Sequence, residues 1–200
     1  MDRKILLVGL ISFLLIGAVG AGVFLFSEPA SFRGTTYAER YPVEPDFALT
    51  RANGNSFRLS ERRGRIIVLF FGYTSCPDVC PITMAELNQT LEKLDDQAAQ
   101  VQVLFVTVDP QRDTPERVQE YVDHFNPNFI GLSGSEAELA KMWNDYGVFR
   151  EVVEGTSAAG YLVNHTARVT LIDRQGNLRV SFPFDTPVED IVHDLKLLLK

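Results

Sequence analysis

The chain has 200 residues, and the part from Asp46 onward is long enough for one domain of ordinary size but excludes a multidomain enzyme. Acidic residues outnumber basic ones by 26 to 19, which gives a formal net charge of −7. An acidic chain without a basic stripe binds phosphate backbones poorly, so nucleic acid is excluded as a partner.

The first predicted element is an uncharged hydrophobic segment of 22 residues at 5–26, longer than the roughly 20 residues that cross a bilayer as a helix. Arg3 and Lys4 precede it, so by the positive-inside rule the rest of the chain is exported. No clean A-x-A cleavage site and no lipobox cysteine follow. We predict an uncleaved anchor over 1–26 and a linker over 27–45, in a bacterial cell membrane with the domain in the periplasm. A cleaved signal peptide is the alternative.

The remaining residues, 46–200, alternate between strand and helix patterns, and one domain is predicted there. In chain order the patterns first predict a hairpin at 47–50 and 57–59, a buried strand at 65–71, a loop at 72–81 that carries both cysteines, and a helix at 82–94. They then predict a strand at 101–108, a helix from 114 to about 125, a short strand at 128–132 and a helix at 135–146. An irregular stretch at 148–164, a hairpin at 167–172 and 178–182, and a last helix at 187–199 complete the domain. This order predicts an α/β, thioredoxin-like fold whose mixed central sheet is flanked by helices.

The chain has two cysteines, Cys76 and Cys80, between a buried strand and the start of a helix. A helix N-terminus favours thiolate, which serves both disulfide exchange and metal binding. Residues four apart on a helix have Cβ atoms about 5–6 Å apart, whereas a disulfide needs about 3.8 Å. Two thiolate–metal bonds of about 2.3 Å span the larger gap, so the spacing favours a metal. Unwinding between Pro77 and Pro81 would still allow a disulfide.

Three histidines are candidates for a third ligand. His124 and His193 fall on amphipathic helices, where a solvated or capping role is expected. His165 precedes a core strand, in a loop that faces the cysteine loop in a thioredoxin-like fold, and the residues alone leave its role as a ligand open. Met84 matches the core spacing of its helix. Two thiolates and an imidazole select copper or zinc, and zinc would prefer a fourth ligand that the sequence does not supply.

Three segments occur in a characteristic order: YTSCPDVCP at 73–81, VDPQRDTPE at 108–116 and YLVNHT at 161–166. Together they resemble the Sco/SenC family of membrane-tethered copper chaperones. The resemblance covers roughly residues 45–200, and the predicted anchor agrees with it. C-x-x-x-C alone would be a weak signal, whereas the three motifs in order are highly specific.

The resemblance implies a site for one copper ion, Cu(I) or Cu(II), with Cys76, Cys80 and His165 as ligands. It also implies that the two cysteines are a redox-active pair that forms a disulfide when oxidised. Asp109 matches the family's Asp-Pro loop and is expected beside the metal. Asp78 fills the acidic position between the cysteines, where it can cap the helix start or repel a second electron-rich ligand.

The family resemblance further implies a role in assembling the binuclear copper site of cytochrome c oxidase subunit II. The protein would deliver copper, reduce the cysteines of that site, or do both. Subunit II is therefore the expected partner, with other copper chaperones or thiol reductants beside it. A metallochaperone is expected rather than an enzyme, and oxidation of the cysteine pair would release the copper.

Other functions are open to a fold of this kind. A thiol–disulfide oxidoreductase is disfavoured by the C-x-x-x-C spacing and by the absence of a proline in 163–168. Residues 47–71 are similar to peroxiredoxins, but the P-x-x-x-T-x-x-C motif is missing, since Thr74 lies only two residues before Cys76. A redox or copper sensor that relays to a membrane partner is a third alternative.

Overall fold

The computed structural model describes residues 31–37, 46–157 and 160–200. The predicted anchor over 1–26 and most of the predicted linker lie outside the described residues. Among the residues that are described, no helix is both long and apolar enough to cross a membrane. Residues Phe32–Lys200 form one compact unit.

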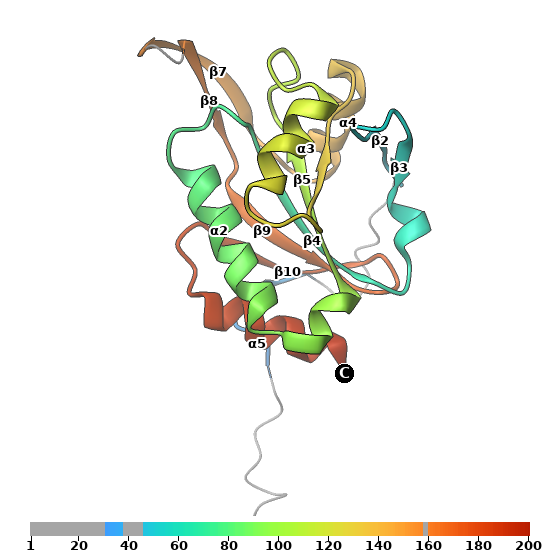
Figure 1. The fold of residues 1–200 in the computed structure, drawn as a ribbon. Coiled ribbons are helices and arrows are strands. Elements are labelled where there is room, and N and C mark those ends of the chain that lie inside the picture. The colour runs from blue at the N-terminus through green and yellow to red at the C-terminus, as the bar shows by residue number, and fades with distance from the viewer. Residues whose placement is uncertain (1–30, 38–45, 158–159) are drawn as a thin grey trace, which may run out of the picture. The chain divides into compact units, whose positions relative to one another are not determined.

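Among the described residues, a six-stranded mixed sheet forms the centre of this unit (Figure 1). Its strands are β1 (Thr35–Thr36), β4 (Ile66–Gly72), β5 (Val101–Thr107), β6 (Ile130–Leu132), β9 (Arg168–Ile172) and β10 (Leu178–Pro183). Their order across the sheet is β1-β10-β9-β4-β5-β6. Neighbours from β4 to β6 are parallel, and those from β4 to β1 are antiparallel. The prediction of a mixed central sheet is confirmed.

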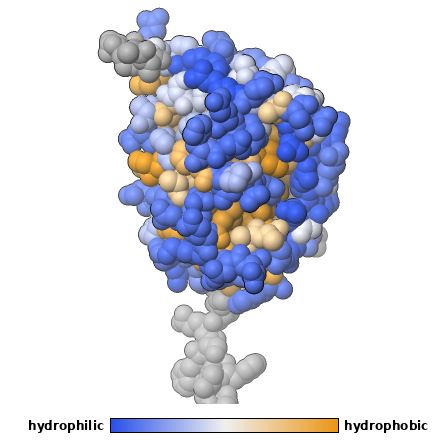
Figure 2. Space-filling model, in the orientation of Figure 1, coloured by the Kyte–Doolittle hydropathy of each residue, from blue (hydrophilic) through white to orange (hydrophobic). Residues whose placement is uncertain are grey.

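Helices flank this sheet, again as predicted. They are α2 (Val79–Glu92), α3 (Pro115–Asp123), α4 (Glu136–Asp145) and α5 (Val188–Leu199), with short 3-10 turns η1 (Leu59–Arg62) and η2 (Asp95–Gln100). Helix α2 packs beside α5, and α3 packs on β5 and β6. Every residue of β4 is buried, as expected for a continuous apolar strand covered on both faces. The surface seen in Figure 2 is mostly hydrophilic, with apolar side chains exposed between polar ones.

Local capping signals explain where α3 and α4 begin. Thr114 is the N-cap of α3, and its side chain accepts a hydrogen bond from the Arg117 N–H. Ser135 and Glu138 form a reciprocal capping box at the start of α4. Such caps satisfy backbone N–H groups that have no partner within the helix. Both helix starts lie where the sequence predicts them.

Two small two-stranded hairpins lie outside the six-stranded sheet, and the first of them is bridged from Thr50 to Ser133, the residue after β6. The first, β2 (Ala48–Thr50) with β3 (Ser56–Arg58), is the predicted Asn-Gly hairpin. The second corrects the prediction of an irregular stretch at 148–164, because β7 (Arg150–Ser157) and β8 (Gly160–His165) pair antiparallel there. This hairpin extends away from the sheet in Figure 1. Val152 and Val153 are adjacent on β7 and both are exposed, so the sequence shows no alternation of apolar and polar residues there.

Candidate metal centre

The two cysteines lie between the end of β4 and the first turn of α2, and they differ in burial. Cys76 is half-buried, and its N–H donates to the Tyr73 carbonyl across 3.2 Å. Cys80 is fully buried and lies in the first turn of α2, which begins at Val79. The predicted loop at 72–81 is therefore too long. Pro81 fits the first helical turn because the backbone N–H that it lacks has no intrahelical partner there.

The start of α2 stabilises charge on the first sulfur. The Cys80 backbone N–H points at Cys76 Sγ, with 3.4 Å between nitrogen and sulfur. A free N–H at a helix N-terminus favours an anion in this position. Both cysteines are free thiols rather than a disulfide.

His165 is the last residue of β8 (Gly160–His165), and its imidazole lies next to the cysteines. Its Nε2 lies 3.8 Å from Cys80 Sγ, and its Nδ1 lies 3.2 Å from the Thr166 carbonyl. Nε2 is therefore the ring nitrogen that faces the buried sulfur, and Nδ1 faces the backbone carbonyl. The rings of Phe70 and Tyr73 meet the imidazole edge to face, with centroids at 6.4 and 5.9 Å. Packing against these two rings therefore holds the imidazole with Nε2 toward Cys80 Sγ.

The two thiols differ strongly in acidity. A hydrogen bond from the Cys80 side chain, helped by His165 and backbone N–H groups, lowers the pKa of Cys76 far below its ordinary value although burial opposes this. The same hydrogen bond, together with burial, raises the pKa of Cys80. These opposite shifts favour the thiolate form at Cys76 and the protonated thiol at Cys80.

Soft donors dominate this cluster. Thiolate sulfur and imidazole nitrogen suit copper or zinc and not magnesium or calcium, so Cys76, Cys80 and His165 fit a soft cation. Among the described residues, no three His, Cys, Asp or Glu side chains already stand at metal-binding geometry together.

The two predicted acidic neighbours are placed differently. Asp78 occupies the N-cap position of α2, but its exposed side chain makes no capping hydrogen bond. Asp109 is fully buried, pairs with Arg112 and accepts a 2.7 Å hydrogen bond from the Tyr161 hydroxyl. Its carboxylate is thus engaged by the β5–α3 loop and the hairpin.

The other candidate ligands have structural roles. His124 follows α3, and its Nδ1 lies 2.6 Å from the Glu120 carbonyl. His193 pairs with Asp194 on α5. Met84 is fully buried in the core, as its helical spacing predicts.

Sequence reasoning missed the groups that support the ligands, with Gly72 among them. An added Cβ at this position would lie 3.0 Å from Cys80 Sγ and 2.8 Å from the Phe105 ring. Real Cβ atoms do not approach heavy atoms so closely, so one neighbour must move. Gly72 stands immediately before the motif YTSCPDVCP, but its packing role needs the fold.

We therefore expect Gly72→Ala to displace Cys80. Overpacking a filled core costs about 1–3 kcal/mol, so the free energy of unfolding should fall by this amount in urea titration. The reactivity of the Cys80 thiol toward a small alkylating reagent should rise, since the sulfur leaves its pocket. Gly64→Ala is the control, because an added Cβ at Gly64 has no neighbour within 4 Å, although its φ of +90° adds backbone strain. An unchanged Cys80 reactivity in Gly72→Ala would contradict the packing role.

Fold and cluster together define a class of protein: a thioredoxin-like domain that presents two thiols and an imidazole between a helix start and a hairpin. A family model described as SCO1/SenC matches residues 35–200. The chain belongs to the SCO1/SenC family.

Individual relatives agree with this assignment. The SCO2-like protein of Rickettsia felis is 32% identical over 202 residues, which is 98% of each chain. The structure is similar to that of apo Sco1 from Thermus thermophilus, with a TM-score of 0.75 and 38% identity over 84% of this chain and 98% of that one. Bradyrhizobium japonicum ScoI with copper bound has a TM-score of 0.69 and 34% identity over 84% and 99%.

Proposed function

We propose that this protein is a membrane-tethered copper chaperone that binds one copper ion through Cys76, Cys80 and His165. The observation that carries the proposal is the 3.8 Å contact between Cys80 Sγ and His165 Nε2, beside a Cys76 sulfur that favours the thiolate form. The copper-bound ScoI relative supports copper as the ion.

Copper binding in this site exchanges protons for the ion. Cys76 is ready as a thiolate, Cys80 must give up its proton, and the neutral imidazole offers Nε2. Oxidation of the two thiolates to a disulfide passes two electrons to another disulfide, which is reduced to a dithiol, and removes both sulfur ligands. The redox state of the pair would therefore gate loading and release.

The client that we propose is subunit II of cytochrome c oxidase. A member of the Sco family is described as one of the cytochrome c oxidase assembly proteins, which supports this choice. The uncharged segment 5–26 supports a tether in the bacterial cell membrane, with residues 46–200 on the periplasmic side. Other copper chaperones or thiol reductants would load or reduce the site.

A second candidate, a thiol–disulfide reductase, is favoured by the unequal acidity of the pair. The half-buried Cys76 thiolate can attack a disulfide, and Cys80 can then displace the mixed disulfide. The client disulfide gains two electrons and leaves as a dithiol, and Cys76 and Cys80 are left as a disulfide. In a copper chaperone the same reaction would prepare the client's cysteines.

Titration of the reduced full-length protein with Cu(I) and Cu(II) tests the proposal. We expect one tightly bound copper per chain, and weaker binding in His165→Ala, because one of three ligands is lost. His124→Ala is the control, since its Nδ1 lies 2.6 Å from the Glu120 carbonyl of α3 and the residue is not a proposed ligand. Full-strength binding by His165→Ala would contradict the three-ligand site. Absence of binding with ready reduction of a model disulfide would favour the reductase.

A further inference from the structure

In the described part of the chain, the hairpin that carries His165 has no strand-to-strand backbone pairing with the central sheet. Its strands β7 and β8 form a separate two-stranded sheet. A two-stranded hairpin is marginally stable in water by itself. Side-chain contacts between the hairpin and the rest of the domain therefore contribute to the position of His165.

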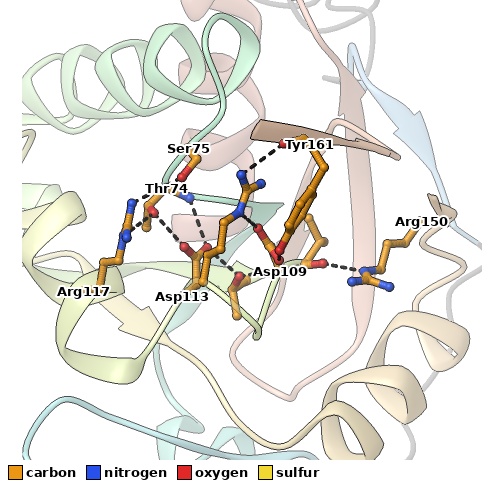
Figure 3. Close-up of polar contacts among 10 residues, drawn as sticks. Thr74, Ser75, Asp109, Asp113, Arg117, Arg150 and Tyr161 are labelled. Atoms are coloured by element: carbon orange, nitrogen blue, oxygen red, sulfur yellow. Dashed lines mark hydrogen bonds and ion pairs between the residues drawn. The ribbon is translucent and has the colours of Figure 1, made fainter. Parts of the chain in front are cut away.

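Those contacts come from the loop between β5 and α3, residues 108–114 (Figure 3). The Tyr161 hydroxyl on β8 donates to Asp109 Oδ1 across 2.7 Å. Arg112 Nη1 donates to the Tyr161 carbonyl across 3.0 Å, and its guanidinium lies 3.7 Å from the centre of the Tyr161 ring. On the neighbouring strand, Arg150 is the cross-strand partner of His165 and donates to the Val108 carbonyl.

The same loop also holds the cysteine loop. The Asp113 carboxylate, 1% exposed, accepts from the Thr74 N–H at 3.0 Å and from the Thr74 hydroxyl at 2.6 Å. It accepts a third hydrogen bond, of 2.7 Å, from the Thr107 hydroxyl. Figure 3 shows Asp113 facing Thr74 while Asp109 faces Tyr161. Thr74 lies two residues before Cys76, so one loop grips both segments that carry the predicted ligands.

Arg112 joins the two sides. It forms an ion pair with Asp109, whose side chain is fully buried, and its guanidinium stacks on Tyr161. It also lies 5.7 Å from the centre of the Tyr73 ring, and that ring meets the His165 imidazole edge to face. A planar guanidinium can stack and donate in several directions at once, which an ammonium group cannot.

We propose that Arg112 is a positioning residue that sets the place of His165 relative to the two cysteines. It acts through Tyr161 and Tyr73 and does not itself bind the ion. The effect on copper rests on the proposed function, whereas the effect on the position of the imidazole does not. Substitution of groups that orient metal ligands costs about 10–100-fold in metal affinity, and this is the loss expected for Arg112→Gln.

The test compares Arg112→Gln with Arg179→Gln in the full-length protein. Arg179 is a matched control, since it also pairs with a buried aspartate, Asp173, and lies over an aromatic ring, that of Phe32. Asp173 follows the end of β9 that is remote from His165. The first readout is the set of nuclear Overhauser contacts in the reduced apo-protein between the His165 ring and the rings of Phe70 and Tyr73.

Loss of these contacts in Arg112→Gln, with the remaining spectrum native and the control unchanged, is the expected result. With Cu(II) bound, the nitrogen hyperfine signal of the imidazole should weaken in electron paramagnetic resonance spectra, and the affinity should fall about 10–100-fold. Native ring contacts in folded Arg112→Gln would overturn the proposal even if copper binds. Failure of the wild type to bind copper would instead contradict the proposed function, and the ring contacts would still decide the role of Arg112.

A second, milder variant covers the case in which Arg112→Gln does not fold. Tyr161→Phe removes only the hydroxyl that donates to Asp109 and keeps the ring against Arg112. We expect it to weaken the same ring contacts to a smaller extent. If Arg112→Gln is unfolded and Tyr161→Phe keeps native contacts around the His165 ring, the proposal is overturned. Arg112 would then be needed only for folding.

Discussion

Replacement of either cysteine by serine is expected to abolish tight copper binding while the domain stays folded. A serine hydroxyl remains protonated near neutral pH and is a harder donor than thiolate, so a soft ion loses a ligand outright. The loss of affinity should exceed the roughly 100-fold that marks the upper range for residues that only orient a ligand. Competition titration with a Cu(I) chelator measures this directly.

The two variants should differ in stability, which gives the experiment an internal control. Cys76 is half-buried, so Cys76→Ser should change the free energy of unfolding by less than about 0.5 kcal/mol. Cys80 is fully buried, and burial of a hydroxyl there costs about 1–3 kcal/mol unless it finds a partner. Ser75→Ala, in the same loop, should keep full copper affinity. Tight binding by either serine variant would exclude that cysteine as a ligand.

The second large effect is expected at Asp113. Asp113→Ala removes the acceptor from three donors, the N–H and hydroxyl of Thr74 and the hydroxyl of Thr107. Each donor left unpaired in a buried site costs about 1–3 kcal/mol. Burial raises the pKa of Asp113, which means that the buried charge is itself unfavourable. Removal of this charge therefore offsets part of the lost stability. We expect a net destabilisation of about 2–4 kcal/mol in urea unfolding.

Asp123→Ala is the matched control for this change. Asp123 is an exposed carboxylate on α3 that accepts a hydrogen bond from the Gln119 side chain, so the variant should stay within about 0.5 kcal/mol of the wild type. Asp113→Asn should lie between the two, because its remaining amide oxygen can still accept from Thr74. Equal stabilities of Asp113→Ala and Asp123→Ala would show that the cysteine loop does not depend on Asp113.

The sequence predicts those parts of the fold whose signals are local. The apolar runs that become β4 and β5 are long and β-branched, and Thr114 and Ser135 cap the helices that follow them. The hairpin at 150–165 was not predicted, because Arg150 and Tyr161 attach it to the β5–α3 loop, which is distant in the sequence. Local pattern carries no information about such contacts.

A similar division holds at the candidate site. The chemistry of Cys76, Cys80 and His165, together with the family resemblance, leads to the cluster that the structure brings together. The groups that support it could not be predicted, because Thr74 meets Asp113 across 39 residues and Tyr161 meets Asp109 across 52. Only the folded chain places these partners side by side.

The most direct test of the central claim is the X-ray absorption spectrum of the reduced, full-length protein loaded with one equivalent of Cu(I). The three-ligand site predicts two sulfur neighbours and one imidazole nitrogen around the copper, and loss of the imidazole signature in His165→Ala. A copper ion surrounded only by oxygen and nitrogen, or an unchanged spectrum in His165→Ala, would contradict the claim that Cys76, Cys80 and His165 hold the metal.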